Sequence, residues 1–369
     1  MTGSLTAKKT PFCLLGIESS CDETAAAIVA SDKVIHANII ASSSALHAQH
    51  GGVVPEIAAR AHLDTLEPVI SKAFAESGLS WDDIDGVAAT GGPGLIGGVL
   101  VGTVAAKAMA RFHDKPYFAI NHLEGHALTA RLTNDTPFPY LLLLVSGGHT
   151  QLLLVREVGQ YERVGTTMDD AAGEAFDKSA KILDLGLPGG PKIEALARQG
   201  DGQSYDLPRP LKNKPGCHFS FSGLKTAVLT AYQNTIAPLD DQKAIDQKKA
   251  DLAASLQRAV AETLASRSRN AMEQFLSDHD VSNPSFVVAG GVAANQLIRQ
   301  MLTDLALEKG FQFNAPPIGL CTDNAVMIAW AAAERMAADL PADPLDFAPR
   351  PRWPLDPEAS PPPGRGVRA

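Results

Sequence analysis

The sequence has few cysteines, no excess of positive charge and no long apolar run. Its four cysteines in 369 residues, Cys13, Cys21, Cys217 and Cys321, lack the close spacing of a disulfide scaffold or a cysteine zinc site. Lys and Arg total 32 against 41 Asp and Glu, and the net charge of -9 excludes a generally basic nucleic-acid binder of the histone type. No apolar run approaches the ~20 residues that span a bilayer, and no secretory signal follows the polar first ten residues. A cytosolic protein is therefore expected.

Several catalytic signatures are also missing. We find no Walker loop, no Gly-x-Ser-x-Gly elbow and no Rossmann fingerprint, and the cysteines have no evident base partner. These absences favour nucleotide binding combined with polarisation by a metal, without a covalent enzyme intermediate.

Two segments share one pattern of apolar strand, short polar turn and second apolar strand. They cover residues 12–29 and 140–155, and their continuous aliphatic runs are typical of strands buried on both faces of an α/β sheet. A chain of this length also suggests roughly two domains. The pattern predicts a duplicated α/β fold, in which each half opens with a hairpin whose turn faces a shared cleft.

Helical spacing and turn residues predict the remaining elements. The expected helices cover about residues 53–77, 95–112, 169–183, 243–279, 293–307 and 323–338, and the expected strands cover 86–90 and 285–289. Residues 1–11 are expected to form a disordered extension. Nine of the 25 prolines lie in 341–369, which predicts an extended or disordered tail.

The segment His122-Leu-Glu-Gly-His126 places two histidines four residues apart. On a helix both imidazoles project from one face, which suits a metal; two histidines without a ligand role are an equally weighted alternative. The zinc-protease motif is excluded, because a leucine follows the first histidine. Asp323 is the best candidate for a third ligand, although it stands at a loop-to-helix junction. The residues alone favour an N-cap there.

Glycine pairs follow two of the expected strands. In Val145-Ser-Gly-Gly-His149 the backbone could approach a phosphate closely, while the alternative is a plain hairpin turn. Gly290 and Gly291 lie between a buried strand and a helix, where α/β folds receive nucleotides. Asn295, one helical turn later, could reach a nucleotide or equally bond to the preceding loop.

Carboxylates also cluster in the sequence. Asp170, Glu174 and Asp177 recur at helical spacing and would repel one another, which favours binding of ribose or a metal; a solvated acidic face is the slightly preferred alternative. Glu18 and Asp22, in the first hairpin turn, are candidate catalytic carboxylates without a firm role.

Nine motifs then occur in order along residues 12–355. They are Gly16-Ile-Glu-Ser-Ser-Cys-Asp-Glu-Thr24, Gly51-Gly-Val-Val-Pro-Glu56, Gly92-Pro-Gly-Leu95, His122-Leu-Glu-Gly-His126, Val145-Ser-Gly-Gly-His-Thr150, Asp169-Asp-Ala-Ala-Gly-Glu-Ala-Phe-Asp-Lys178, Phe219-Ser-Phe-Ser-Gly-Leu-Lys225, Ala289-Gly-Gly-Val292 and Cys321-Thr-Asp-Asn324. With these motifs the chain closely resembles the catalytic subunits of bacterial tRNA N6-adenosine threonylcarbamoyltransferase, a family once labelled O-sialoglycoprotein endopeptidase.

The resemblance implies an actin-like ATPase (ASKHA) fold of two ribonuclease-H-like halves with an interdomain cleft. The first half would cover residues 12–120 with helix 323–338, and the second, with the metal and nucleotide site, residues 121–322. The resemblance makes His122, His126 and Asp323 ligands of one divalent metal, Fe2+ with Zn2+ as the alternative, against the N-cap interpretation. The implied contacts of the substrate's adenylate are Leu144, Val145, Ser146, Gly147, Gly148, Asp177, Gly190, Glu194 and Asn295. Glu194 departs from the family pattern, because several relatives have Asp there.

The implied reaction moves a threonylcarbamoyl group from threonylcarbamoyl-AMP to N6 of adenosine 37, in tRNAs that read codons beginning with A. The implied partners are tRNA, a small P-loop ATPase and an inactive paralogous subunit that binds the small-residue helix near residues 97–110. Because the chain is acidic, we expect it to bind tRNA weakly by itself. Two alternatives are a metallopeptidase, which lacks a Glu beside the first histidine, and a non-catalytic nucleotide-binding scaffold.

Overall fold

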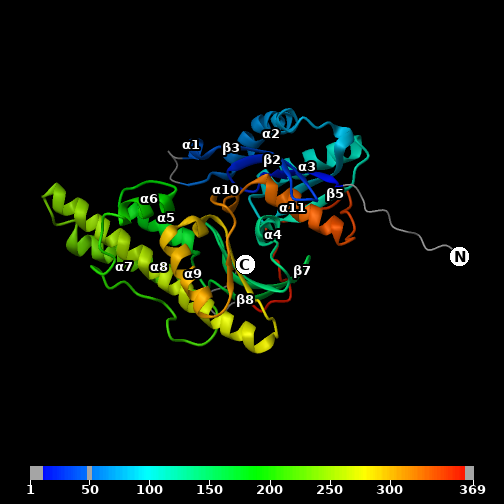
Figure 1. Ribbon diagram of the computed structural model, residues 1–369. Helices are drawn as coiled ribbons and strands as arrows, with labels where there is room; N and C mark the ends of the chain where they lie inside the picture. Colours follow the sequence, from blue (N-terminus) through cyan, green and yellow to red (C-terminus); the bar gives the residue numbers. More distant parts are fainter. Residues whose placement is uncertain (1–10, 48–51, 362–369) are drawn as a thin grey trace. The chain divides into compact units, whose positions relative to one another are not determined.

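The computed structural model describes residues 11–47 and 52–361, which form two compact units (Figure 1). Unit 1 comprises Met1–Thr133 and Asp323–Pro354, and unit 2 comprises Asn134–Thr322 and Leu355–Ala369. Apart from Pro11, the predicted N-terminal extension lies outside the described residues, as does Gly51 of the second motif.

Unit 1 is built on a five-stranded mixed sheet of order β3-β2-β1-β4-β5. β1 pairs antiparallel with β2 and parallel with β4; β2 pairs antiparallel with β3, and β4 pairs parallel with β5. The strands are β1 (Cys13–Glu18), β2 (Glu23–Ala30), β3 (Ile35–Ser42), β4 (Ile84–Gly92) and β5 (Tyr117–Asn121). The helices are α1 (Ser44–His47), α2 (Pro55–Ser77), the 3-10 helix η2 (Trp81–Asp83), α3 (Ile96–Phe112), α4 (His122–Asn134) and α11 (Ala325–Ala337).

Unit 2 repeats this arrangement with a sheet of order β10-β9-β6-β7-β8. The pairs β6–β7 and β7–β8 are antiparallel, and the pairs β6–β9 and β9–β10 are parallel. The strands are β6 (Tyr140–Val145), β7 (Thr150–Glu157), β8 (Gln160–Thr166), β9 (Ser285–Ala289) and β10 (Gln312–Asn314). The helices are α5 (Ala172–Ile182), α6 (Gly189–Ala197), α7 (Ser222–Thr235), α8 (Gln242–Asp278), the 3-10 helix η3 (Gly291–Ala294), α9 (Gln296–Glu308) and α10 (Ile318–Cys321).

The two sheets have the same topology, strand for strand, when β1–β5 are matched to β6–β10. This repetition confirms the duplicated α/β fold that the two hairpins predict. The continuous aliphatic runs are explained by burial on both sheet faces: Leu14, Leu15, Leu142 and Leu143 are all fully buried.

In unit 1, α2 and α3 cover one face of the sheet and α11 covers the other. Leu15 and Ile17 of β1 pack in one cluster with Leu66 of α2 and Ala106 of α3. Gly16 faces α11 so closely that a Cβ atom would lie 2.6 Å from the carbonyl oxygen of Ala325. A glycine here lets β1 and α11 approach each other closely. One of the predicted metal ligands, Asp323, lies just before α11.

The expected helices and strands are present with boundaries within a few residues. We predicted a division after residue 120, whereas unit 1 continues through α4 to Thr133. α4 packs on α11: the indole Nε1 of Trp330 donates a hydrogen bond to the carbonyl oxygen of Leu128 at 3.1 Å. Both histidines of the predicted metal site therefore belong to unit 1. None of the helices in the described residues is long and apolar enough to cross a membrane.

Residues 341–361 contain no helix or strand, yet much of this segment is held to unit 1. The amide of Asp343 donates to the carbonyl oxygen of Tyr117 and the amide of Arg350 to that of Gly91, both at 2.8 Å. The Asn121 amide group donates to the carbonyl oxygen of Trp353 at 2.9 Å. The proline-rich segment is therefore a packed strap over residues 343–353. Proline count alone gave no sign of these contacts.

Candidate metal centre and nucleotide turns

The structure brings His122, His126 and Asp323 together in unit 1. Both histidines are in the first turns of α4, and their rings lie at 86° to one another with centroids 4.9 Å apart. Nε2 of His126 lies 3.2 Å and Nε2 of His122 lies 3.5 Å from Oδ1 of Asp323. The three ligand atoms lie within 4.8 Å of one another. Two imidazoles and one carboxylate thus converge as the resemblance implies.

Asp323 is not the N-cap of α11, so the interpretation that the residues alone favour is wrong. The cap is the next residue, Asn324, whose side chain accepts a hydrogen bond from the amide of Met327 at 3.1 Å. Capping by Asn324 leaves the Asp323 carboxylate free to face the two histidines. A sequence argument could not separate these neighbours, because Asp and Asn cap helices about equally well.

Two carboxylates make this site strongly negative. Burial by itself lowers the pKa of His122, but the charges of Asp323 and Glu18 and their hydrogen bonds raise that pKa well above its ordinary value. Burial acts to raise the pKa of Asp323, yet the facing His122 and His126 lower it well below its usual range. Both shifts show a site that favours positive charge, whether a proton on His122 or a cation between the ligands.

The donor set fits a divalent transition metal. Two neutral imidazole nitrogens and one carboxylate oxygen form the ligand set of non-haem Fe(II) sites that keep open coordination positions. Zinc accepts the same donors. His126 offers Nε2 toward Asp323, while its Nδ1 is buried without a hydrogen-bond partner in the described part of the chain. The carboxylate of Asp323 is 28% exposed, which leaves one side of the site accessible to a substrate.

The two candidate catalytic carboxylates have different surroundings. Glu18, at the end of β1, is buried and lies 3.0 Å from Nδ1 of His122. Asp22 lies in the following turn, and its carbonyl oxygen accepts a hydrogen bond from Ser43. Burial, reinforced by the charge of Asp22, raises the pKa of Glu23 to about 8. Glu18 therefore contacts the histidine pair directly, and sequence reasoning missed the altered carboxyl of Glu23.

The glycine turns lie together in unit 2 with open space beside them. A Cβ atom on Gly290, whose φ is +97°, would lie 2.5 Å from the carbonyl oxygen of Val145, so the turns after β6 and β9 are in contact. By contrast, a Cβ atom on Gly147, Gly148 or Gly291 would have no atom of the described residues within 4 Å, apart from its chain neighbours. The side of each of these three glycines that a Cβ atom would occupy is thus open, which gives an approaching phosphate room beside the turns.

The other predicted adenylate contacts adjoin these turns. Gly190, in the first turn of α6, faces open space, while the amide of Gly189 donates to the Asp177 carboxylate at 2.7 Å. Burial raises the pKa of Asp177 even though this hydrogen bond opposes the shift. Glu194 accepts a hydrogen bond from the amide of Gln296 at 2.9 Å, at the start of α9. These contacts join α5, α6 and α9 into one group with the turns.

Asn295 has a structural role that the sequence left open. Its Oδ1 accepts a hydrogen bond from the amide of Ile298 at 3.1 Å, and its Nδ2 donates to the Gln257 side chain at 2.9 Å. Asn295 is therefore the N-cap of α9, fixed in place beside Gly291. One Nδ2 hydrogen and the second lone pair of Oδ1 lie outside these two bonds.

The carboxylates of Glu174 and Asp177 in α5, and of Asp170 just before it, are largely neutralised. Lys178 lies 2.7 Å from Asp170 and 2.9 Å from Glu174, so these two form ion pairs instead of repelling each other. Asp177, bound to Gly189, is the remaining member of the row. A metal or ribose bound by all three carboxylates is therefore not needed to explain the row.

The paired glycines allow a direct stability test. We expect Gly290→Ala to lower the melting temperature by roughly 6–12 °C, because the side chain meets backbone at 2.5 Å and the φ of +97° is strained for alanine, together about 3 kcal/mol. Gly291→Ala is the matched control at the next position, and it should change the melting temperature by about 2 °C or less. Equal effects in differential scanning calorimetry would show that the turns after β6 and β9 are not in close contact.

Comparison with known proteins agrees with the geometry. Residues 34–330 match the family model described as tRNA N6-adenosine threonylcarbamoyltransferase. The chain belongs to this family. Curated members from Brucella suis and Brucella abortus, named tRNA N6-adenosine threonylcarbamoyltransferase, are each 56% identical over 360 residues, which cover 96% of this chain and 98% of theirs.

Solved structures with more distant sequences support the fold. Full-length HypF matches with a TM-score of 0.56 at 12% identity, and the match covers 90% of this chain and 47% of HypF. HypF from T. kodakarensis matches with a TM-score of 0.54 at 15% identity, with 90% and 48% covered. At such identities the similarity concerns the fold alone. It supports the α/β fold class of this member of the threonylcarbamoyltransferase family.

Proposed function

We propose that the chain transfers the threonylcarbamoyl group of threonylcarbamoyl-AMP to N6 of adenosine 37, in tRNAs that read codons beginning with A. Membership of the tRNA N6-adenosine threonylcarbamoyltransferase family supports the reaction class. The observation that carries the proposal is the convergence of His122, His126 and Asp323 in such a chain. Residues 197 apart in sequence meet here around one point.

We propose one divalent metal at these three ligands, with Fe2+ preferred and Zn2+ as the alternative. Bound there, the metal would supply a Lewis acid for carbamoyl or phosphate oxygens. The chain's own contribution is the geometry: α4 fixes both imidazoles on one face, and Asn324 caps α11 so that the adjoining Asp323 carboxylate points to them.

The proposed adenylate site consists of the turns of unit 2. Backbone amides at Gly147, Gly148 and Gly291 would donate to the phosphate, and Ser146 would add a hydroxyl. Gly190 and Glu194 of α6, with Asp177 and Asn295, would hold the ribose and base; Leu144 and Val145 form the adjoining end of β6. Binding AMP as a leaving group stabilises the charge that develops when the carbamoyl carbon is attacked by the adenosine amine.

A metallopeptidase is a poorer account of the same residues. The carboxylate between the histidines, Glu124, is fully engaged: its Oε2 lies 2.6 Å from the Arg335 guanidinium. It is not placed as a base for a water molecule. A non-catalytic nucleotide-binding scaffold would require the turns but has no use for the convergent ligands of unit 1.

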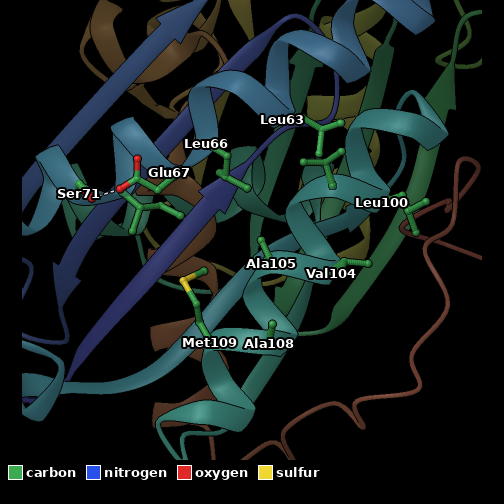
Figure 2. Close-up of a pocket in the computed structure, with 11 residues that line it drawn as sticks. Leu63, Leu66, Glu67, Ser71, Leu100, Val104, Ala105, Ala108 and Met109 are labelled. Carbon is green, nitrogen blue, oxygen red and sulfur yellow. Dashed lines mark hydrogen bonds between the residues drawn. The ribbon is translucent and has the colours of Figure 1, made fainter.

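We propose that the outer face of α2 and α3 binds a paralogous, inactive subunit. Apolar side chains from both helices line a groove of about 640 Å³ in unit 1 (Figure 2). Leu63 of α2 and Val104 of α3 are 67% and 55% exposed, and Leu100 of α3 is also exposed. Figure 2 shows Ala105 and Ala108 on the same side of α3, where small residues permit a close approach by another helix. A contiguous apolar patch of this kind marks a protein interface.

The remaining partners are those that the reaction and the family resemblance imply. tRNA is the acceptor, and a small P-loop ATPase would belong to the same complex. We propose a cytoplasmic location, which the four free thiols support because disulfides are rare in that compartment.

The decisive experiment is reconstitution of the reaction. The full chain, its partner subunits, tRNA and threonylcarbamoyl-AMP are mixed, and the tRNA nucleosides are analysed by mass spectrometry. We expect threonylcarbamoyladenosine only when this chain is present. Its absence with all partners present would overturn the proposed reaction, and cleavage of a glycoprotein by the pure chain would favour a peptidase.

A further inference from the structure

The carboxylate of Glu18 sits behind His122, on the side of the ring away from Asp323. Its Oε2 lies 3.0 Å from Nδ1 of His122, whereas Nε2 of the same ring faces Asp323. Thr90 donates its hydroxyl to Oε2 of Glu18 at 2.6 Å, and the amide of Ser20 donates to Oε1 at 2.6 Å. The side chain is 1% exposed, so these partners determine how its oxygens point.

This arrangement distinguishes the two ring nitrogens of His122. An ionised carboxylate can only accept hydrogen bonds, so Nδ1 must carry a hydrogen where it faces Glu18. Thr90 and the amide of Ser20 already donate to the two oxygens of Glu18, so this carboxylate acts as an acceptor and Nδ1 of His122 is its third donor. The Ser20 hydroxyl, 3.2 Å from Nδ1, can donate or accept and therefore selects neither tautomer.

We infer that Glu18 is a positioning residue that holds His122 with a hydrogen on Nδ1, so that Nε2 is left as the ligand nitrogen. The inference rests on the metal centre proposed above. Histidine ligands of metals are commonly oriented in this way by a carboxylate behind the ring, and the loss of such a group weakens metal binding. Glu18 would thus serve the site without touching substrate.

Glu18→Gln is an informative change because the glutamine cannot turn freely. The amide of Ser20 is a fixed backbone donor, so it keeps the glutamine oxygen at the Oε1 position. The glutamine NH2 group then faces Nδ1 of His122 and donates to it. The hydrogen of the neutral ring is thereby moved to Nε2, which is the nitrogen that should bind the metal.

The measurement is the affinity of the full-length chain for Co2+, after metal has been removed with a chelator. We expect Glu18→Gln to weaken Co2+ binding by about 10–100-fold and to alter the visible absorption of the bound ion. Glu124→Gln is the matched control: it is also a buried glutamate of unit 1, in the same turn as the histidines, but it pairs with Arg335. We expect its Co2+ affinity to stay within about 3-fold of the unchanged chain.

A second measurement is made on the unchanged chain and needs a variant only for the assignment of the spectrum. The chain is labelled with 15N at histidine, loaded with Zn2+ and studied by NMR; the signals of His122 are assigned by their loss in His122→Gln. We expect Nδ1 of His122 to carry a hydrogen and Nε2 to be the metal-bound nitrogen. A metal-bound Nδ1, or Co2+ affinity and absorption unchanged by Glu18→Gln, would overturn the role of Glu18. Failure of the unchanged chain to bind Co2+ would instead overturn the metal centre, and the inference with it.

Discussion

Asp323→Asn should abolish transfer of the threonylcarbamoyl group, with a rate loss of more than about 100-fold. Loss of a group that only supports a metal ligand lowers metal affinity or activity by up to about 100-fold. Because Asp323 is proposed as a ligand itself, its loss should have a larger effect. The change keeps the shape of the side chain but removes the negative charge that faces both histidines at 3.2 and 3.5 Å. The rate is measured by mass spectrometry of tRNA nucleosides, and bound metal by elemental analysis of the same samples.

The chain offers a control at the other end of the same helix. Asp339 follows α11, is exposed and has a left-handed φ of 54°, which asparagine also adopts readily. Asp339→Asn should therefore retain both metal and activity. If Asp323→Asn kept its metal and transferred at the normal rate, His122, His126 and Asp323 would not be the centre of the reaction.

The parts of this site that are local in sequence could be predicted, and the parts that depend on tertiary contacts could not. The spacing of His122 and His126 places both rings on one helix face whatever the rest of the fold does. Asp323 lies 197 residues from His126, and its sequence neighbourhood favours a helix cap. Only the hydrogen bond from the amide of Met327 to the Asn324 side chain shows that Asn324 caps the helix instead. Glu18 and Thr90 likewise meet across two strands, with nothing in either segment to indicate the contact.

The fold was predictable for a different reason. Both sheets open with strands whose aliphatic runs are buried on two faces, and this signal is strong enough to be seen twice in one chain. The packing of the strap at residues 343–353, in contrast, could not be predicted. Proline removes backbone donors and regular structure, but the remaining amides of Asp343 and Arg350 still bond to unit 1. Composition therefore predicted an irregular backbone there and was silent about its packing.

The apolar groove of unit 1 gives the second large expected effect. The double variant Leu100→Glu, Val104→Glu places two charges one turn apart on the exposed face of α3. Two carboxylates buried at an apolar interface without partners should cost at least about 3 kcal/mol, which is more than 100-fold in the dissociation constant of the paralogous subunit. Both side chains are about half exposed in the chain itself, so the fold should be kept.

Binding is measured by isothermal titration calorimetry with the purified paralogous subunit, and folding by circular dichroism. The control is Leu307→Glu, because Leu307 is an apolar residue of unit 2 that is 68% exposed on α9, outside the groove. We expect it to bind the subunit normally. Loss of binding in Leu307→Glu together with full binding by the double variant would place the interface on another surface. If the double variant lost the subunit but transferred the threonylcarbamoyl group at the normal rate, the subunit would be dispensable for catalysis while the groove remained its binding site.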